Sequence, residues 1–321
     1  MDLSQKKILA GIFYAAVSVL CWSTAFPVAS ALLQQKSCID PVTLTAFRFL
    51  IGGSAMLLCY PLFTRRNPAQ GMTWREWRDF AFHGIFTALM SLLLFKAQET
   101  IPVVNASMLE AEAPLVMFVL GILIHRTKNS FLQITGLLLG FTGCLMVLNA
   151  LHFSGLQIRS LTGGDLLVFA SASCWAFYTV LARKTIQKVG GFLYSAWSLL
   201  SGGIWVTLYA LTRWDQLLFP VSIQAWLGAL HLALITTALA FFAWNNAQNY
   251  ISIGLLSISG YFTPAFAALL GWSFFGEKLA LSQICGMGLV LFSALIEPAI
   301  NELLQTAYKR IFSSGAKEDQ H

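Results

Sequence analysis

Residues 87–145 open with Thr87-Ala88-Leu89, and 150 positions later residues 237–295 open with Thr237-Ala238-Leu239. At the same offset Ala97-Gln98 matches Ala247-Gln248, Pro114 matches Pro264, Leu120-Gly121 matches Leu270-Gly271, and Gln133-Ile134-x-Gly136 matches Gln283-Ile284-x-Gly286. Upstream, Ala46, Leu50, Gly52 and Gly53 match Ala196, Leu200, Gly202 and Gly203, while Cys21-Trp22 matches Cys174-Trp175 at an offset of 153. A constant offset indicates an internal repeat. We therefore predict one repeat over residues 1–155, a second over 156–300 and a short tail over 301–321.

The chain is 57% hydrophobic and only 11% charged, with a mean hydropathy of +0.69, whereas charged residues make up about a quarter of a soluble domain. This composition is typical of an integral membrane protein. Apolar windows of about 20 residues, long enough to cross a hydrocarbon core of about 30 Å, fall at 8–33, 42–63, 79–100, 103–124, 131–150, 164–183, 192–211, 224–247, 252–275 and 280–299. Continuous apolar runs exclude the alternating strands of a membrane barrel. We predict an all-α integral membrane protein with ten transmembrane helices, five in each repeat.

The distribution of basic residues predicts the orientation. With the N-terminus inside, fourteen of the twenty Lys and Arg residues fall on the inner side, and only Lys36, Arg159, Arg213 and Lys278 fall outside. By the positive-inside rule both termini are then cytoplasmic, and we expect a multi-pass protein of the cell inner membrane. The net charge of +6 follows from this topology, so it implies no nucleic-acid partner.

An odd number of spans in each repeat has a geometric consequence. The second repeat would enter the membrane from the opposite side, so the two copies would be inverted relative to each other. Inverted repeats are a recurring architecture of secondary transporters, in which the substrate binds near the bilayer midplane where the copies meet. We therefore predict two inverted five-helix repeats around a central cavity.

Two acidic residues lie within the fourth predicted span, at Glu110 and Glu112. A charge near the middle of a bilayer costs about 3 kcal/mol even on the permissive insertion scale, so each carboxylate needs a partner, water or a proton. Lys96, near the end of span three, is one candidate partner because the turn between the spans is short. The counterparts 150 residues later are uncharged. Three interpretations stay open: a strut between helices, proton coupling, or recognition of a cationic group.

Further candidates come from both repeats. Trp22 and Trp175 are matched residues near mid-span, where they either pack between helices or wall the cavity and stack on a substrate. Arg48 lies about two turns inside the membrane edge, where it could snorkel towards water; we favour a structural or gating anchor. We predict that the substrate site draws on Trp22, Glu110, Glu112, Trp175, Tyr178, Trp244, Asn245 and Tyr261, with Arg48, Lys96, Pro114 and Pro264 in coupling or gating.

The prolines, glycines and histidines within the predicted spans each have an expected role. Pro114 and Pro264 each lie near mid-span, where a missing amide kinks a helix, so we expect hinges. The matched glycines permit close approach of helices. His83 and His231 are single histidines on apolar helices, and we interpret them as hydrogen-bonded core residues.

Together these features resemble the drug/metabolite transporter superfamily, EamA family. The resemblance rests on Cys21-Trp22-Ser23-Thr24-Ala25-Phe26-Pro27, Arg48-Phe49-Leu50, the two mid-span prolines and Gly276-Glu277-Lys278-Leu279 before Gln283-x-x-Gly286. It implies ten helices around a central cavity working by alternating access. The chain departs from the family where Arg126-Thr127 replaces a Gly-Glu and where span four carries Glu110 and Glu112. Members of this family move amino acids, purine derivatives, drugs and S-adenosylmethionine, so the fold does not select the substrate.

The leading hypothesis is a secondary carrier for a small polar metabolite with a positive group, such as an amino acid or S-adenosylmethionine. The alternatives are an exporter of drugs or other metabolites coupled to protons, a channel, and an integral-membrane enzyme. The enzyme is disfavoured because Asp-x-x-x-Asp, His-x-x-x-His, Gly-x-Ser-x-Gly and phosphate-binding motifs are missing from the sequence. We expect no cofactor and no metal. The partners would be the substrate and the lipid bilayer, with coupling to protons or exchange left open, and the protein would be a monomer or a weak dimer.

Overall fold

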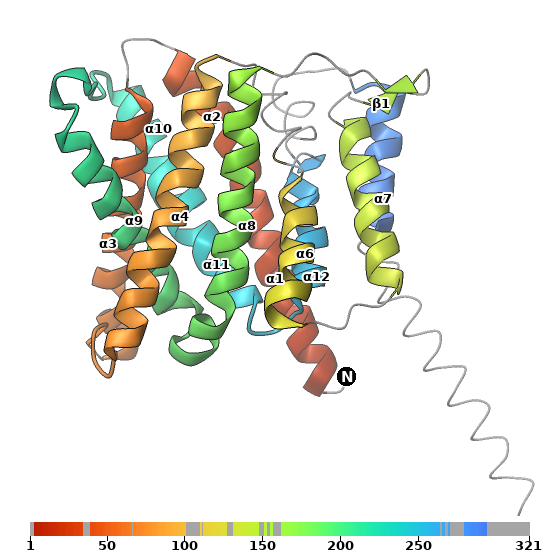
Figure 1. The fold of residues 1–321 in the computed structure, drawn as a ribbon, viewed down its shortest axis with the longest axis horizontal. Helices are drawn as coiled ribbons and strands as arrows, with labels where there is room; N and C mark the ends of the chain where they lie inside the picture. The colour runs from red at the N-terminus through yellow and green to blue at the C-terminus, as the bar shows by residue number, and fades with distance from the viewer. Residues whose placement is uncertain are drawn as a thin grey trace, which may run out of the picture.

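A computed structural model describes residues 3–34, 39–65, 67–100, 110, 112–126, 131–147, 151–152, 155–156, 162–263, 265–266, 269 and 279–293. The first half contains helices α1 (Leu3–Ser23), α2 (Ala25–Gln34), α3 (Pro41–Thr64), α4 (Trp74–Gln98), α6 (Ala113–His125) and α7 (Phe131–Val147). A two-residue hairpin follows, in which β1 (Leu151–His152) pairs antiparallel with β2 (Gly155–Leu156). The helices pack side by side in one bundle (Figure 1).

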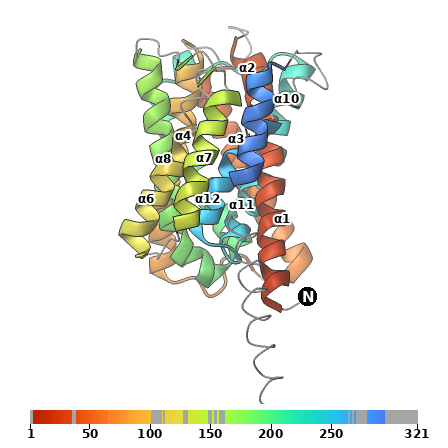
Figure 2. The same ribbon diagram turned by 90° about the vertical axis from the view of Figure 1, so that its right-hand side faces the viewer.

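The second half is also helical. It contains α8 (Gly163–Val189), α9 (Gly191–Leu211), the 3₁₀ turn η1 (Trp214–Gln216), α10 (Ile223–Ala233), the π-helix η2 (Leu234–Leu239), α11 (Ala240–Ala247) and α12 (Ile253–Gly260). A further apolar helix covers Leu281–Ser293 and lies beside α7 at one side of the bundle (Figure 2).

Each of the ten predicted spans contains a helix in the part of the chain that is described. Five helical stretches are long and apolar enough to cross a membrane: Gln5–Leu33, Pro41–Leu62, Trp74–Gln98, Gly163–Val189 and Ile223–Ala247. Ala113–His125, Phe131–Val147 and Leu281–Ser293 are shorter apolar helices. The prediction of an all-helical membrane protein is confirmed, while the number of crossings stays a prediction.

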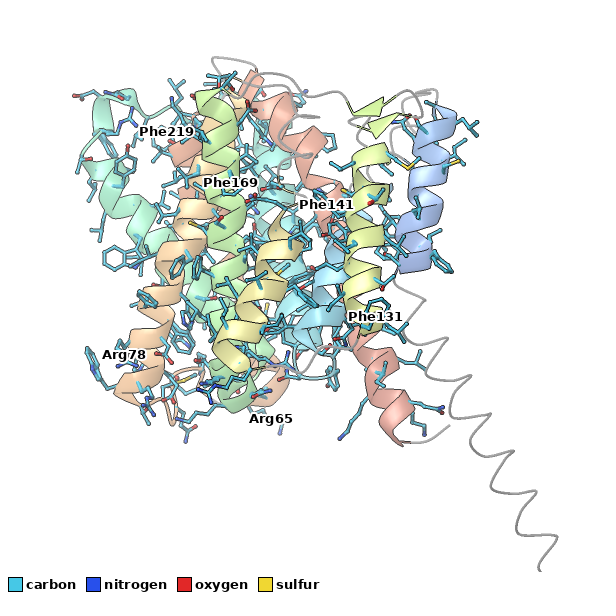
Figure 3. The ribbon with its side chains drawn as sticks, turned by 45° about the vertical axis from the view of Figure 1, so that its right-hand side comes forward. Arg65, Arg78, Phe131, Phe141, Phe169 and Phe219 are labelled. Carbon is cyan, nitrogen blue, oxygen red and sulfur yellow. The ribbon has the colours of Figure 1, made fainter. Side chains whose placement is uncertain are left out.

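The outside of the bundle carries large apolar side chains, as a lipid-facing surface requires. Phe131 is 80% exposed and Leu62 79% exposed. Figure 3 shows Phe131, Phe169 and Phe219 on the outside, and it places Arg65 and Arg78 together at the lower end. The N-terminus lies at that end as well (Figure 1), so the first helix and the basic α3–α4 loop share one side of the molecule.

Local sequence sets the helix starts. Asp40 caps α3 by accepting hydrogen bonds from the backbone of Val42 and Thr43, and Pro41 occupies the first turn, where its missing amide is harmless. Capping boxes begin α4 at Thr73 and α8 at Thr162. These caps satisfy amides that lipid could not satisfy.

Matched glycines hold the two halves together, and their contacts are reciprocal. A Cβ added to Gly53 would lie 2.7 Å from the amide nitrogen of Leu200, and a Cβ added to Gly203 would lie 2.9 Å from that of Leu50. Both residues of the second contact are the 150-residue counterparts of those in the first. Backbones this close leave no room for a side chain. The packing role predicted for these glycines is confirmed.

Two breaks in regular helix lie close together inside the bundle. The chain turns at Thr24, between α1 and α2, and η2 interrupts the helix formed by α10 and α11. Nε1 of Trp22 donates to the carbonyl of Thr236 over 3.0 Å, and the Thr24 hydroxyl lies 2.9 Å from Nε2 of His231. The two irregular segments therefore fix each other, and they position the candidate site.

Candidate functional site

Five aromatic side chains form a cluster in the interior, which we call the central aromatic cluster: Trp22, Trp175, Tyr178, Phe241 and Trp244. They come from α1, α8 and α11. The ring centroids of Trp22 and Trp175 are 5.0 Å apart in an edge-to-face arrangement, and Trp22 and Trp244 are 5.1 Å apart. The matched tryptophans, predicted either to pack between helices or to wall the cavity, therefore touch directly and pack against each other in this conformation.

The three indole N–H groups of the cluster have different partners. Trp22 donates to the carbonyl of Thr236, and Trp244 donates to the Thr179 hydroxyl over 3.1 Å. Trp175 is half-buried, and its N–H makes no hydrogen bond within the described parts of the chain. Trp175 is thus the cluster residue that retains a donor for another molecule.

A hydrogen-bonded network lies directly against this cluster. Asn245 donates to the hydroxyl of Tyr178 over 2.8 Å and to that of Ser195 over 2.9 Å, and Tyr178 is 3.1 Å from the hydroxyl of Ser198. Tyr178, Trp244 and Asn245 are fully buried or nearly so. These hydrogen-bonding groups therefore point inward and satisfy one another.

Arg48 is buried beside the π-helix. It is only 5% exposed, so the prediction that it could snorkel to water is wrong. Its Nε donates to the Thr237 hydroxyl over 2.7 Å, and its guanidinium lies 5.4 Å from the ring centroids of Phe49 and Phe95. Helix α3 thus holds a positive charge in the interior by one hydrogen bond and two aromatic faces, as a structural anchor would.

Glu110 supplies the opposite charge. It is half-buried and interacts electrostatically with Arg48. The ion pairs recorded within 4.0 Å in the described residues involve neither of them. The two charges therefore face each other across the interior without a close contact.

Glu112 lies two residues further along the chain, at the start of α6. Its carboxyl interacts with Ser173 on α8, but its Oε1 is buried without a hydrogen-bond partner. A buried unpaired oxygen is costly unless the group is protonated or meets a ligand.

Lys96 does not serve as the partner of these acids. It is exposed, and its ammonium lies 2.5 Å from Glu99, the residue that caps the end of α4. The prediction failed because the end of α4 turns this side chain outward, where Glu99 is three residues away.

Other predicted residues have mixed outcomes. Pro114 is the second residue of α6 rather than a kink within a continuous helix, because that helix begins at Ala113. Pro264 lies outside the described residues. Tyr261 is fully buried, with its hydroxyl unpaired. His83 and His231 are hydrogen-bonded, to Tyr194 and Thr24, as predicted.

The sequence did not identify Thr236 and Thr237 as the residues that accept hydrogen bonds from Trp22 and Arg48. The recurrence of Thr87-Ala88-Leu89 as Thr237-Ala238-Leu239 marked this segment, but nothing in the letters indicated a π-helix. Among the described residues no group of three or more His, Cys, Asp or Glu side chains is arranged to hold a metal.

Comparison with known proteins agrees with this architecture. The model of the EamA-like transporter family matches residues 9–149 and again 162–296. The chain is 25% identical over 312 residues to the uncharacterized transporter YdfC of Bacillus subtilis (strain 168), covering 95% of this chain and 97% of that one. It is 25% identical over 285 residues to protein PecM of Dickeya dadantii (strain 3937), covering 88% and 90%.

A solved crystal structure shares the fold, with a TM-score of 0.73 at 21% identity, covering 94% of this chain and 99% of that chain. The two family matches together span most of the sequence, with residues 150–161 between them. The chain therefore belongs to the EamA-like transporter family and is a multi-pass membrane transporter.

Proposed function

We propose that the protein is a secondary active transporter that moves a small polar metabolite by alternating access. The substrate would carry a positive group, as an amino acid or S-adenosylmethionine does. The observation that carries this proposal is Glu110, an acid inside the bundle that interacts electrostatically with Arg48 without a close ion pair among the described residues. A carboxylate that is not held in a direct ion pair has room beside it in which a cationic group can bind.

The repeat architecture supports alternating access. In Figure 1, α1 begins at the lower end of the bundle and α8 begins at the upper end. The reciprocal contacts of Gly53 with Leu200 and Gly203 with Leu50 are those expected of two units related by an approximate two-fold axis. Opposite direction and two-fold packing together support inverted repeats, which would switch access by rocking one unit against the other. The repeats would cover residues 1–155 and 156–300, within ten membrane crossings, with 301–321 as a tail.

The central aromatic cluster supports the substrate class. The face of an aromatic ring attracts a cation, most strongly in tryptophan. Trp175 also keeps its N–H free of any described partner. We assign Trp22, Trp175, Tyr178, Trp244, Asn245 and Tyr261 to the wall of the site and Glu110 and Glu112 to charge recognition, with Arg48 and Pro114 in gating.

The charge distribution supports the placement in the membrane. Arg65, Arg78 and the N-terminus share one end of the bundle (Figures 1 and 3), and by the positive-inside rule that end is cytoplasmic. The protein would then sit in the cell inner membrane with both termini in the cytoplasm, acting as a monomer or a weak dimer.

Reconstitution tests the proposal. The protein is placed in liposomes loaded with unlabelled amino acids or S-adenosylmethionine, and exchange of the labelled compound is measured across a series of pH values. We expect saturable exchange of at least one of these cationic compounds. We also expect Glu110→Gln to abolish exchange or alter its pH dependence, and Glu112→Gln to weaken it.

Glu99→Gln is the matched control, because Glu99 contacts only the exposed Lys96 and should leave exchange unchanged. If both Glu110→Gln and Glu112→Gln transport like the original protein at every pH, the carboxylates are struts and the substrate class is wrong. Flux without saturation or exchange would indicate a channel. Net export of apolar drugs driven by a proton gradient would favour the exporter.

A further inference from the structure

A second hydrogen-bonded chain begins at His83 on α4. His83 is 5% exposed, and its Nδ1 lies 2.9 Å from the hydroxyl of Tyr194 on α9. Its counterpart 150 residues later is Ala233, so the repeat packs without an imidazole at this position. The histidine was therefore introduced into one half only.

Charged groups connect His83 to the end of the bundle where Arg78 lies (Figure 3). Asp79, one helical turn earlier, interacts with His83 electrostatically. Its side chain is 24% exposed and accepts a hydrogen bond from Thr185 of α8 over 3.0 Å. Asp79 also pairs with Arg78 over 3.3 Å, and Glu76 of α4 contacts Lys188 of α8. Asp79 is thus the group through which His83 meets the water at that end.

Tyr194 connects His83 to the central aromatic cluster. The rings of Tyr194 and Tyr178 have centroids 5.8 Å apart, and their hydroxyl groups interact. Tyr178 in turn accepts from Asn245 and stacks on Trp175 with centroids 5.5 Å apart. A path of interacting side chains therefore leads from the solvent-facing carboxylate of Asp79 through His83 and Tyr194 to the candidate substrate site.

We propose that His83 is the proton-binding site of the transporter and that its protonation is transmitted through Tyr194 to Tyr178 and the central aromatic cluster. This inference rests on the proposed function, because coupling requires transport. Proton binding itself can be measured without any substrate.

The physical basis is the direction of one hydrogen bond. When His83 is neutral with its proton on Nε2, Nδ1 accepts from the Tyr194 hydroxyl. A proton taken from water forms a new N–H bond at Nδ1, which must then donate to the Tyr194 oxygen. The Tyr194 O–H is released and turns towards Tyr178, whose hydroxyl must redistribute its bonds with Asn245 and Ser198. No bond between heavy atoms forms or breaks.

Protonation of His83, which reverses the hydrogen bond to Tyr194, shifts the equilibrium between the two access states if those states differ in hydration around His83. A ligand shifts a conformational equilibrium only by its differential affinity for the two states. In this conformation the imidazole is buried and lies beside the rings of Phe82 and Tyr194. A state that admits water at Asp79 would bind the proton more tightly, and Asp79 would stabilise the imidazolium.

The test uses the full chain in lipid nanodiscs, with ¹⁵N-labelled histidine and no substrate. Imidazole nitrogen signals are followed between about pH 3 and about pH 8, a range that extends below the ordinary histidine titration because His83 is buried, and His83→Gln assigns the signal of His83. Tryptophan fluorescence is recorded over the same range, and Trp175→Phe isolates the contribution of Trp175. We expect the His83 signal and the Trp175 fluorescence to change with one common midpoint.

Tyr194→Phe is the decisive variant, because it keeps the ring and removes only the hydroxyl. It should leave the His83 titration in place and eliminate the fluorescence change. His231→Gln, which alters the histidine bonded to Thr24, should preserve both responses. The proposal is overturned if His83 keeps one protonation state over the whole range, or if Tyr194→Phe retains the fluorescence change. Absence of exchange in liposomes with an intact titration would instead reject the proposed transport function.

Discussion

Helix α4 and the segment α10–η2–α11 are counterparts in sequence, yet their backbones differ. Both contain Thr-Ala-Leu, at 87–89 and 237–239, and both end near Ala-Gln. Helix α4 is continuous from Trp74 to Gln98, whereas its counterpart passes through a π-helix over Leu234–Leu239. The shared sequence Thr-Ala-Leu thus lies in an α-helix in one half of the molecule and in a π-helix in the other.

Side chains from the first half account for this difference. Trp22 donates to the carbonyl of Thr236, and Arg48 donates to the hydroxyl of Thr237. Their counterparts have other roles, since the N–H of Trp175 has no hydrogen-bond partner among the described residues and Ser198 bonds to Tyr178. π-Helical turns expose backbone groups and occur frequently at functional sites. The counterpart of Thr236 is Phe86 and that of Leu234 is Gly84, so the asymmetry of the duplicated bundle involves both these two donors and changes within the segment that deforms.

Replacing Arg48 should have the largest effect on this asymmetry. Arg48→Leu removes the donor to Thr237 and leaves Glu110 without an opposing charge, so we expect a loss of about 3–5 kcal/mol in the free energy of unfolding. Denaturant titration in mixed micelles measures it. Combining Arg48→Leu with Glu110→Gln should restore more than half of the loss. Full stability of the single variant would show that the two charges do not interact.

Replacing each of the paired threonines by valine compares the two segments directly. Thr237→Val deprives a buried guanidinium of its acceptor and should cost about 2 kcal/mol. Thr87→Val removes only a bond to the carbonyl of Gly84 in its own helix and should cost about 0.5 kcal/mol. Equal losses of unfolding free energy for the two variants in the same micelle titration would show that the hydrogen bond from Arg48 does not make Thr237 more important for stability than Thr87.

The paired glycines probe the surfaces against which each segment packs. A Cβ on Gly52 would lie 2.8 Å from the carbonyl oxygen of Ala233, whereas one on Gly202 would meet the Thr87 hydroxyl. A backbone group yields less readily than a side chain, so Gly52→Ala should cost about 1.5 kcal/mol and Gly202→Ala less. Thermal unfolding in detergent reports both. Gly288→Ala is the control, since nothing lies within 4 Å of the added atom; a loss there equal to that of Gly52→Ala would remove the packing argument.

Removing the indole donor should have the smallest effect. Trp22→Phe keeps an aromatic ring in the cluster but leaves the Thr236 carbonyl without its donor, at a cost of about 1 kcal/mol. Hydrogen exchange of the amides in 234–239 should accelerate more than exchange in 84–89. Trp205→Phe, which loses an exposed bond to Ala81, serves as control. Unchanged exchange in 234–239 would show that the π-helix does not depend on Trp22.

Much of the fold could be predicted from the letters. The matched glycines were expected to permit close approach of helices, and Gly53 and Gly203 do approach the backbones of Leu200 and Leu50. The apolar windows located the helices because helix length is set by the bilayer. The candidate site was predicted less well, since Lys96 turned outward and Arg48 inward although both are cations within apolar stretches. Their directions depend on helix rotation, which small-residue packing fixes and hydropathy does not report.

The sequence by itself determined that this protein is a duplicated, helical membrane protein, because repetition and apolar length are properties of the chain alone. Only the tertiary structure decided that Arg48 and Trp22 reach the second half and that Tyr178, Asn245 and Trp244 satisfy one another in the interior. The physical reason is that a buried donor must find an acceptor in three dimensions, and residues separated by 189 and 214 positions become neighbours only when both halves have packed.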